Sequence, residues 1–93
     1  MASEQIRVRL LVSGQVQGVF FRASTRDAAR ELSLTGWVRN TRGGDVEVEA
    51  QGAQDDVERL IAFIRDDPGH AAVGDVARED IAPIDGDARF DVR

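Results

Sequence analysis

Residues 6–32 have the sequence IRVRLLVSGQVQGVFFRASTRDAAREL, whose pattern predicts a strand, a turn and a helix in succession. As far as Ser13, apolar residues occupy every second position, which is the period of a half-buried strand: Ile6, Val8, Leu10 and Val12. Gly14 and Gly18 bracket the turn, and glycine permits backbone angles that other residues resist. Over about residues 21–33 the inward positions recur at the spacing of an amphipathic helix: Phe21, Thr25, Ala28 and Leu32.

A β-hairpin follows this unit. Residues 36–40 and 46–51 are β-prone and are joined by a turn at residues 41–44. A further strand is predicted within residues 74–82, and residues 90–93 favour a short edge strand.

A second amphipathic helix lies between the hairpin and these last strands. Its apolar residues have the spacing i, i+3, i+4 and i+7: Val57, Leu60, Ile61 and Ile64. Asp55 and Asp56 lie in its first turn, where they favour the positive end of the helix dipole. Pro68 and Gly69 are expected to end it.

The resulting order is β-α-β-β-α-β with a short fifth strand. It predicts an α+β fold, the ferredoxin-like or split β-α-β sandwich, with two helices on one face of an antiparallel sheet. No linker or repeat interrupts the chain, so we expect one domain over residues 1–93, with residues 1–4 flexible. The first two strands should run parallel, which places their carboxyl ends, Ser13 and Asn40, at the same edge of the sheet.

The composition excludes several kinds of chemistry. The 93 residues include no cysteine, and all twelve basic residues are arginine. Disulfides, thiolate zinc sites, cysteine nucleophiles, lysine Schiff bases and Walker-type phosphate loops are therefore excluded. The single histidine, His70, is expected in a solvent-facing loop and cannot form a multi-histidine metal site. Arginine, amides, hydroxyls and carboxylates must carry any chemistry.

Hydropathy predicts a soluble, cytoplasmic protein. The apolar runs are far shorter than the ~20 residues that span a bilayer, and residues 1–5 lack the character of a signal peptide.

Charge is distributed unevenly along the chain. The net charge is −5, but residues 1–44 hold seven arginines against three acidic residues, which gives +4. The remainder holds five arginines against fourteen acidic residues, which gives −9. The first part is where an anion would bind, although charges that merely cover solvated faces would give the same split.

The turn between the first strand and the first helix is a candidate anion site. It brings free backbone N–H groups, a helix N-terminus and Arg22 close together, and the planar guanidinium suits a phosphate or carboxylate. Asn40, at the end of the second strand, would face the same cleft. On spacing alone, an ordinary surface Arg22 and a turn-capping Asn40 are the more common explanations of these residues.

Two stretches resemble the signatures of the acylphosphatase family. Residues 14–22, GQVQGVFFR, match its pattern G-x-V-Q-G-V-x-F-R at every specified position. The run GWVRN at residues 36–40, followed by Gly44, Val46 and Gly52, resembles its second signature. The resemblance covers nearly the whole chain and weakens after Pro68; Ser33 stands where the family often has glycine.

This resemblance implies hydrolysis of the carboxyl-phosphate bond of acyl phosphates, with no metal, cofactor or covalent intermediate. Carried over by position, Arg22 would bind the phosphoryl group and Asn40 would orient the attacking water. The phosphoryl oxygens would be surrounded by the backbone amides of five residues: Gln17, Gly18, Val19, Phe20 and Phe21. The expected partner is a small acyl phosphate, with no nucleic acid or membrane, and the expected state is a monomer.

Two other functions fit parts of the pattern. A phosphoanion-binding or regulatory domain without turnover would keep the anion site, but it would not need a water-orienting Asn40. A nucleic-acid-binding ferredoxin-like module would present stacked aromatics on its central strands, and the first and third predicted strands carry none. Of the remaining residues, Trp37 is expected in or near the core, and Arg42 is a better candidate than Arg39 for steering a substrate.

Overall fold

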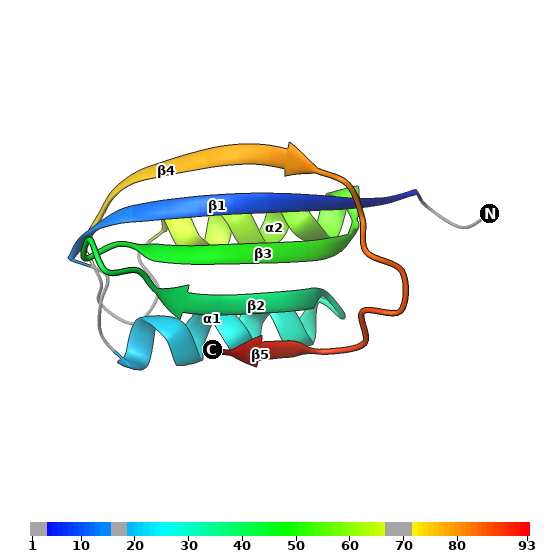
Figure 1. Cartoon of the computed structure of the whole chain (residues 1–93), viewed down its shortest axis with the longest axis horizontal. Coiled ribbons are helices and arrows are strands. Elements are labelled where there is room, and N and C mark those ends of the chain that lie inside the picture. Colours follow the sequence, from blue (N-terminus) through cyan, green and yellow to red (C-terminus); the bar gives the residue numbers. More distant parts are fainter. Residues whose placement is uncertain (1–3, 16–18, 67–71) are drawn as a thin grey trace.

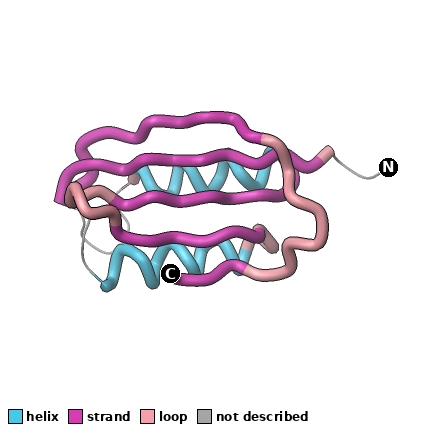
Figure 2. The backbone as a smooth tube through the Cα atoms, in the orientation of Figure 1, coloured by secondary structure: helices cyan, strands magenta, loops and turns pink. Residues whose placement is uncertain are grey.

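The computed structural model, which describes residues 4–15, 19–66 and 72–93, shows a single sheet with both helices on one face (Figure 1). Figure 2 traces the same layers by secondary structure. Along the chain the elements are β1 (Gln5–Gln15), α1 (Val19–Glu31), β2 (Thr35–Asn40), β3 (Val46–Ala53), α2 (Gln54–Arg65), β4 (Ala72–Ile81) and β5 (Phe90–Val92). Neither described helix is long and apolar enough to cross a membrane.

The strand order is β4-β1-β3-β2-β5, which confirms the ferredoxin-like α+β fold. β3 lies in the middle and pairs antiparallel with both β1 and β2, so these two strands run parallel to each other. The sheet is nevertheless mixed rather than wholly antiparallel, because β5 pairs parallel with β2. After β4 the chain crosses the far end of the sheet, so β5 starts beside the start of β2 and runs in its direction (Figure 1).

The bounds of the two helices differ from the predicted ones. α1 starts at Val19 rather than Phe21, because the first turn of a helix carries no periodic signal of its own. α2 already ends at Arg65, before Pro68 and Gly69, which lie outside the described residues.

The core fills the space between the helices and the sheet. Alternate residues of β1 and β3 form the sheet side of the core, and the apolar residues of α2 pack against them, as the spacing predicts. The buried apolar residues are Val8, Leu10, Val12, Phe21, Ala29, Leu34, Val38, Val46, Val48, Ala50, Val57, Leu60, Ile61, Ile64 and Phe90.

The opposite face of the sheet carries a polar network around Arg7, whose side chain is only 2% exposed. Its Nε donates to Glu49 Oε1 at 2.9 Å, and its NH1 donates to Asp87 Oδ2 at 2.8 Å and to Gln51 Oε1 at 3.2 Å. Gln51 in turn bonds both the backbone N–H and the carbonyl of Ile84. The network therefore attaches the β4–β5 connection to the middle of the sheet.

Arg9 pairs with the same glutamate but remains 45% exposed, with NH2 3.1 Å from Glu49 Oε2. The hydrogen bond to Glu49 raises the pKa of the Arg9 guanidinium above its ordinary value. Arg9 therefore stays charged throughout the physiological range and adds no pH dependence there.

The expectation that Trp37 packs in or near the core is wrong, because its side chain lies on the other face of the sheet. Trp37 lies opposite Glu49 in the β2–β3 register, on the face away from the helices, while its neighbour Val38 is the buried residue. The guanidinium carbons of Arg39 and Arg93 lie 5.1 and 5.3 Å from the centre of the indole ring, within cation–π range. A strand alternates its sides strictly, so Val38 and Trp37 cannot both face the core.

The end of α1 places Ser33 in the left-handed region, with φ 57°. Ser33 N–H donates to the carbonyl of Arg30, and Leu34 N–H donates to that of Ala29, which is the bonding pattern of a Schellman motif. Glycine is usual at this position because a Cβ is disfavoured there.

We predict that Arg7→Ala lowers the free energy of unfolding by about 3 kcal/mol or more, because it leaves Glu49 buried without its main partner. Arg9→Ala is the matched control, since it removes an exposed partner of the same carboxylate, and it should lower the free energy of unfolding much less than Arg7→Ala. Urea denaturation measures both. Equal losses would show that the buried pair contributes no more than the exposed one.

We also predict that Ser33→Gly stabilises the protein by about 0.5–1 kcal/mol, because relief of left-handed strain exceeds the added freedom of glycine in the unfolded chain. Ser33→Ala keeps the Cβ and should give no gain. Thermal denaturation of the three proteins tests this, and a gain in the alanine variant would contradict the strain explanation.

Candidate active site

The carboxyl ends of β1 and β2 lie at the same edge of the sheet, as the parallel arrangement requires. Val46, the first residue of β3, is paired with Val12 on one side and with Asn40 on the other. Because neighbouring strands lie roughly 4.8 Å apart, the backbones of Val12 and Asn40 are separated by about 10 Å. The N-terminal end of α1 lies at this edge too (Figure 1). The ends of β1 and β2 and the start of α1 therefore lie together at one edge of the sheet.

The chain leaves β1 through an irregular backbone. The pairing of β1 with β4 shifts register between Ser13 and Gly14, and Gly14 has φ 115°, which glycine adopts without strain. Gln17 and Gly18, whose amides are expected to surround a phosphoryl group, lie outside the described residues. Their role stays a prediction.

The first turn of α1 consists of backbone that can receive an anion. Val19, Phe20 and Phe21 begin the helix, so their N–H groups have no acceptor four residues earlier within it. The first turn of α1 contains no acidic residue, whereas that of α2 contains Asp55 and Asp56. The positive pole of α1 is therefore not offset by a carboxylate of its own first turn. Phe21 is buried in the core and anchors this turn.

Arg22 follows directly on this turn and is half-buried. Its Nε is enclosed by protein yet has no hydrogen-bond partner among the described residues. Buried donors in folded proteins are almost always bonded, and one left unbonded costs about 1–3 kcal/mol. An ordinary surface arginine, solvated along its guanidinium, does not explain this geometry. A bound anion or an ordered water does.

Asn40 is the last residue of β2 and is exposed. It shares a side of the strand with the buried Gly36 and Val38, which is the side that α1 covers. Its side chain makes no hydrogen bond among the described residues, so it does not cap the turn that follows.

Thr41 caps that turn instead, a role that was not predicted from the sequence. Its Oγ1 accepts the N–H of Asp45 at 3.2 Å, and its own N–H donates to the carbonyl of Asp45 at 2.8 Å. A threonine at the start of a turn is a known capping signal. With Thr41 in this role, the amide of Asn40 is available at the edge of the sheet.

The acylphosphatase family model matches residues 8–92 of the chain. The chain belongs to the acylphosphatase family. The matched span contains both Arg22 and Asn40, which the signatures had indicated.

Individual relatives agree with this assignment. An acylphosphatase from Rubrobacter xylanophilus is 46% identical over 93 residues, covering 99% of this chain and 84% of the relative. The structure of an acylphosphatase from Coxiella burnetii gives a TM-score of 0.88 at 45% identity, covering 96% of this chain and 93% of that one. The crystal structure of the Bacillus subtilis acylphosphatase gives a TM-score of 0.89 at 28% identity, covering 95% and 98%. The expected hydrolase class is confirmed.

Arg39 and Arg42, which lie on either side of Asn40 in the sequence, differ in their ion pairing. Arg39 points to the opposite face, where its NH2 lies 2.7 Å from Glu47 Oε1. Arg42 lies exposed in the turn and has no ion-pair partner among the described residues. This agrees with the preference for Arg42 over Arg39 as a steering residue for an acylphosphatase substrate.

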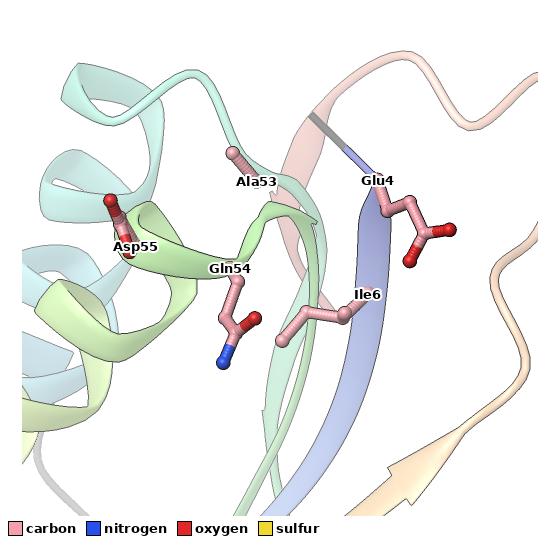
Figure 3. Close-up of a pocket in the computed structure, with 5 residues that line it drawn as sticks. All are labelled: Glu4, Ile6, Ala53, Gln54 and Asp55. Carbon is pink, nitrogen blue, oxygen red and sulfur yellow. The ribbon is translucent and has the colours of Figure 1, made fainter. Parts of the chain in front are cut away.

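Cavities lie elsewhere on the protein as well. Figure 3 shows one of about 250 Å³ at the opposite end of the sheet, where β1 begins and α2 starts. Its lining is acidic at two of five positions: Glu4, Ile6, Ala53, Gln54 and Asp55. The described residues also include no cluster of three or more histidine, cysteine, aspartate or glutamate side chains that could hold a metal ion.

Proposed function

We propose that this acylphosphatase-family protein hydrolyses the carboxyl-phosphate bond of small acyl phosphates without a metal ion. Arg22 and the amides of residues 17–21 hold the phosphoryl group, and Asn40 orients the attacking water. The observation that carries this proposal is the buried Nε of Arg22, which has no hydrogen-bond partner among the described residues and lies beside the first turn of α1. A phosphoryl oxygen or a water that accompanies it would complete the bonding of that nitrogen.

The chemistry suits a site with these side chains. Water attacks phosphorus in line, the bond from phosphorus to the acyl oxygen breaks, and the carboxylate leaves with the bonding electrons. Because a carboxylic acid has a pKa of roughly 4, the leaving group needs no proton from a general acid. The water's protons pass to the phosphate product. What remains for the protein is positioning and charge stabilisation, which arginine, amides and one asparagine supply.

Arg42 adds positive potential at the entrance of the site. Its guanidinium, which is exposed and has no ion-pair partner in the part of the chain that the structure describes, would attract the anionic substrate over several ångströms, an effect that salt screens. It would therefore contribute to the rate of encounter rather than to the chemical step.

We further propose that residues 1–93 act as one domain, as a monomer in the cytoplasm, without a nucleic-acid partner. The described residues share one hydrophobic cluster, and arginine–glutamate pairs cover the open face of the sheet where a nucleic acid would stack. Light scattering would give 10.2 kDa for a monomer, and cell fractionation would give the compartment.

We predict that the purified protein hydrolyses acetyl phosphate at the same rate with and without a chelator, because no step requires a Lewis acid. Release of inorganic phosphate measures the rate. Loss of activity with EDTA, restored by a divalent metal, would overturn the metal-free mechanism.

We predict that Arg22 contributes mainly to phosphate binding and Asn40 mainly to kcat. Arg22→Ala should weaken binding of inorganic phosphate roughly 10- to 100-fold, because it removes charged hydrogen bonds worth about 1.5–3 kcal/mol. Asn40→Ala should lower kcat roughly 100-fold while phosphate affinity stays close to wild type. Competitive inhibition by phosphate and steady-state kinetics give both quantities.

Arg42→Ala is the matched arginine control for Arg22→Ala. It should lower kcat/KM only severalfold at low salt, and the difference from wild type should vanish at high ionic strength. Full turnover in Asn40→Ala would remove its water-orienting role, and equal effects of the two arginine variants would remove the special role of Arg22.

A further inference from the structure

Two enclosed side-chain atoms have no hydrogen-bond partner among the described residues, and both belong to α1. They are Arg22 Nε and Thr25 Oγ1. By contrast, Arg7, which is the most buried charged side chain among the described residues, donates hydrogen bonds to Glu49, Gln51 and Asp87. The two unpartnered atoms therefore need a common explanation.

Arg22 and Thr25 are neighbours on the helix surface. Residues three apart on a helix have Cβ atoms about 5–6 Å from each other. Helical side chains also point back toward the N-terminus, so the side chain of Thr25 covers the turn that holds Phe21 and Arg22. The Thr25 side chain therefore faces the turn from which the Arg22 side chain leaves the helix.

Because Thr25 is buried, a hydroxyl without a hydrogen bond at this position lowers the stability of the fold. Thr25 is 0% exposed and occupies the inward stripe of α1 between Phe21 and Ala29, which are both apolar. A buried threonine in a helix usually bonds the carbonyl four residues earlier, but Thr25 Oγ1 has no such partner here. Valine would fill the same volume without burying a polar atom. Packing alone does not account for a threonine at this position.

We propose that Thr25 is a positioning residue for Arg22, acting through one shared buried water. Arg22 Nε–H donates to this water, and the water donates to Thr25 Oγ1. Buried waters are typically held by two to four polar groups of this kind. The inner edge of the guanidinium is then held against the helix, and its four remaining N–H donors face outward.

This arrangement deepens the proposed function and rests on it for its catalytic consequence. An arginine held in place before the phosphoryl group arrives loses less rotational freedom on binding. The loss of Thr25's hydroxyl should therefore weaken binding of phosphate and substrate, whereas the chemical step, which Asn40 serves, should change little.

The decisive comparison is between Thr25→Val and Thr25→Ser. Thr25→Val keeps the shape and removes the hydroxyl, and it should raise KM and the inhibition constant of inorganic phosphate roughly five- to tenfold, with kcat within about twofold. Thr25→Ser keeps the hydroxyl and should bind phosphate within about twofold of wild type. Ser24→Ala, which removes a hydroxyl from a different side of the same helix, is the control for helix effects.

Thermal stability separates positioning from packing. Thr25→Val should be at least as stable as wild type, and Thr25→Ser should be less stable because it loses a buried methyl group. Thr25→Val is then the more stable variant but the weaker phosphate binder, and Thr25→Ser is the less stable variant but the stronger binder. If Thr25→Val binds phosphate like wild type, or if Thr25→Ser loses as much binding as Thr25→Val, the proposal is wrong.

An NMR measurement tests the proposal independently of enzymatic turnover. In the phosphate-free protein, Nε–H of Arg22 should exchange slowly with solvent in wild type and Thr25→Ser, and at least about tenfold faster in Thr25→Val. Unchanged exchange in Thr25→Val would refute the positioning role even in an active enzyme. Slow exchange that depends on Thr25, in a protein that does not hydrolyse acyl phosphates, would refute the proposed function instead.

Discussion

The pairing of β3 with both β1 and β2 is the constraint on which the rest of the structure depends. It makes β1 and β2 parallel, and Val46 holds their ends level, opposite Val12 on one side and Asn40 on the other. A helix that joins two such strands must start where the first ends and run back to where the second begins. The positive end of α1 therefore lies at the edge of the sheet that Asn40 reaches, without any contact between their side chains being needed.

Five of the twelve arginines fall into two groups, one on the open face of the sheet and one near the start of α1. On the open face of the sheet, Arg7, Arg9 and Arg39 pair with the glutamates of β3, and the degree of burial decides how strongly each pair contributes. At the site, Arg22 and Arg42 have no ion-pair partner among the described residues. Part of the acidic excess of the second half of the chain is thus paired with arginines on the open face of the sheet.

Most of the fold was predictable because it follows from local periodicity. The alternation in β1 and the helical spacing in α1 and α2 each require burial on one side, and every predicted strand and helix is present. The errors have physical causes. β5 is too short for its sequence to indicate the direction in which it pairs, and Trp37 is apolar enough to suggest the core, although the alternation of β2 assigns the core to Val38.

By itself, the sequence determined the elements, the family signatures and the side-chain types available for chemistry, because these depend on residues close together in the chain. Only the tertiary structure decided which arginines are neutralised, since Arg7 and Glu49 are 42 residues apart and meet only through the β1–β3 register. It also decided that Thr41, rather than Asn40, caps the turn, and that Thr25 and Arg22 each carry a buried polar atom with no hydrogen-bond partner among the described residues. Hydrogen bonding and burial depend on what surrounds a side chain in space, which sequence spacing alone does not specify.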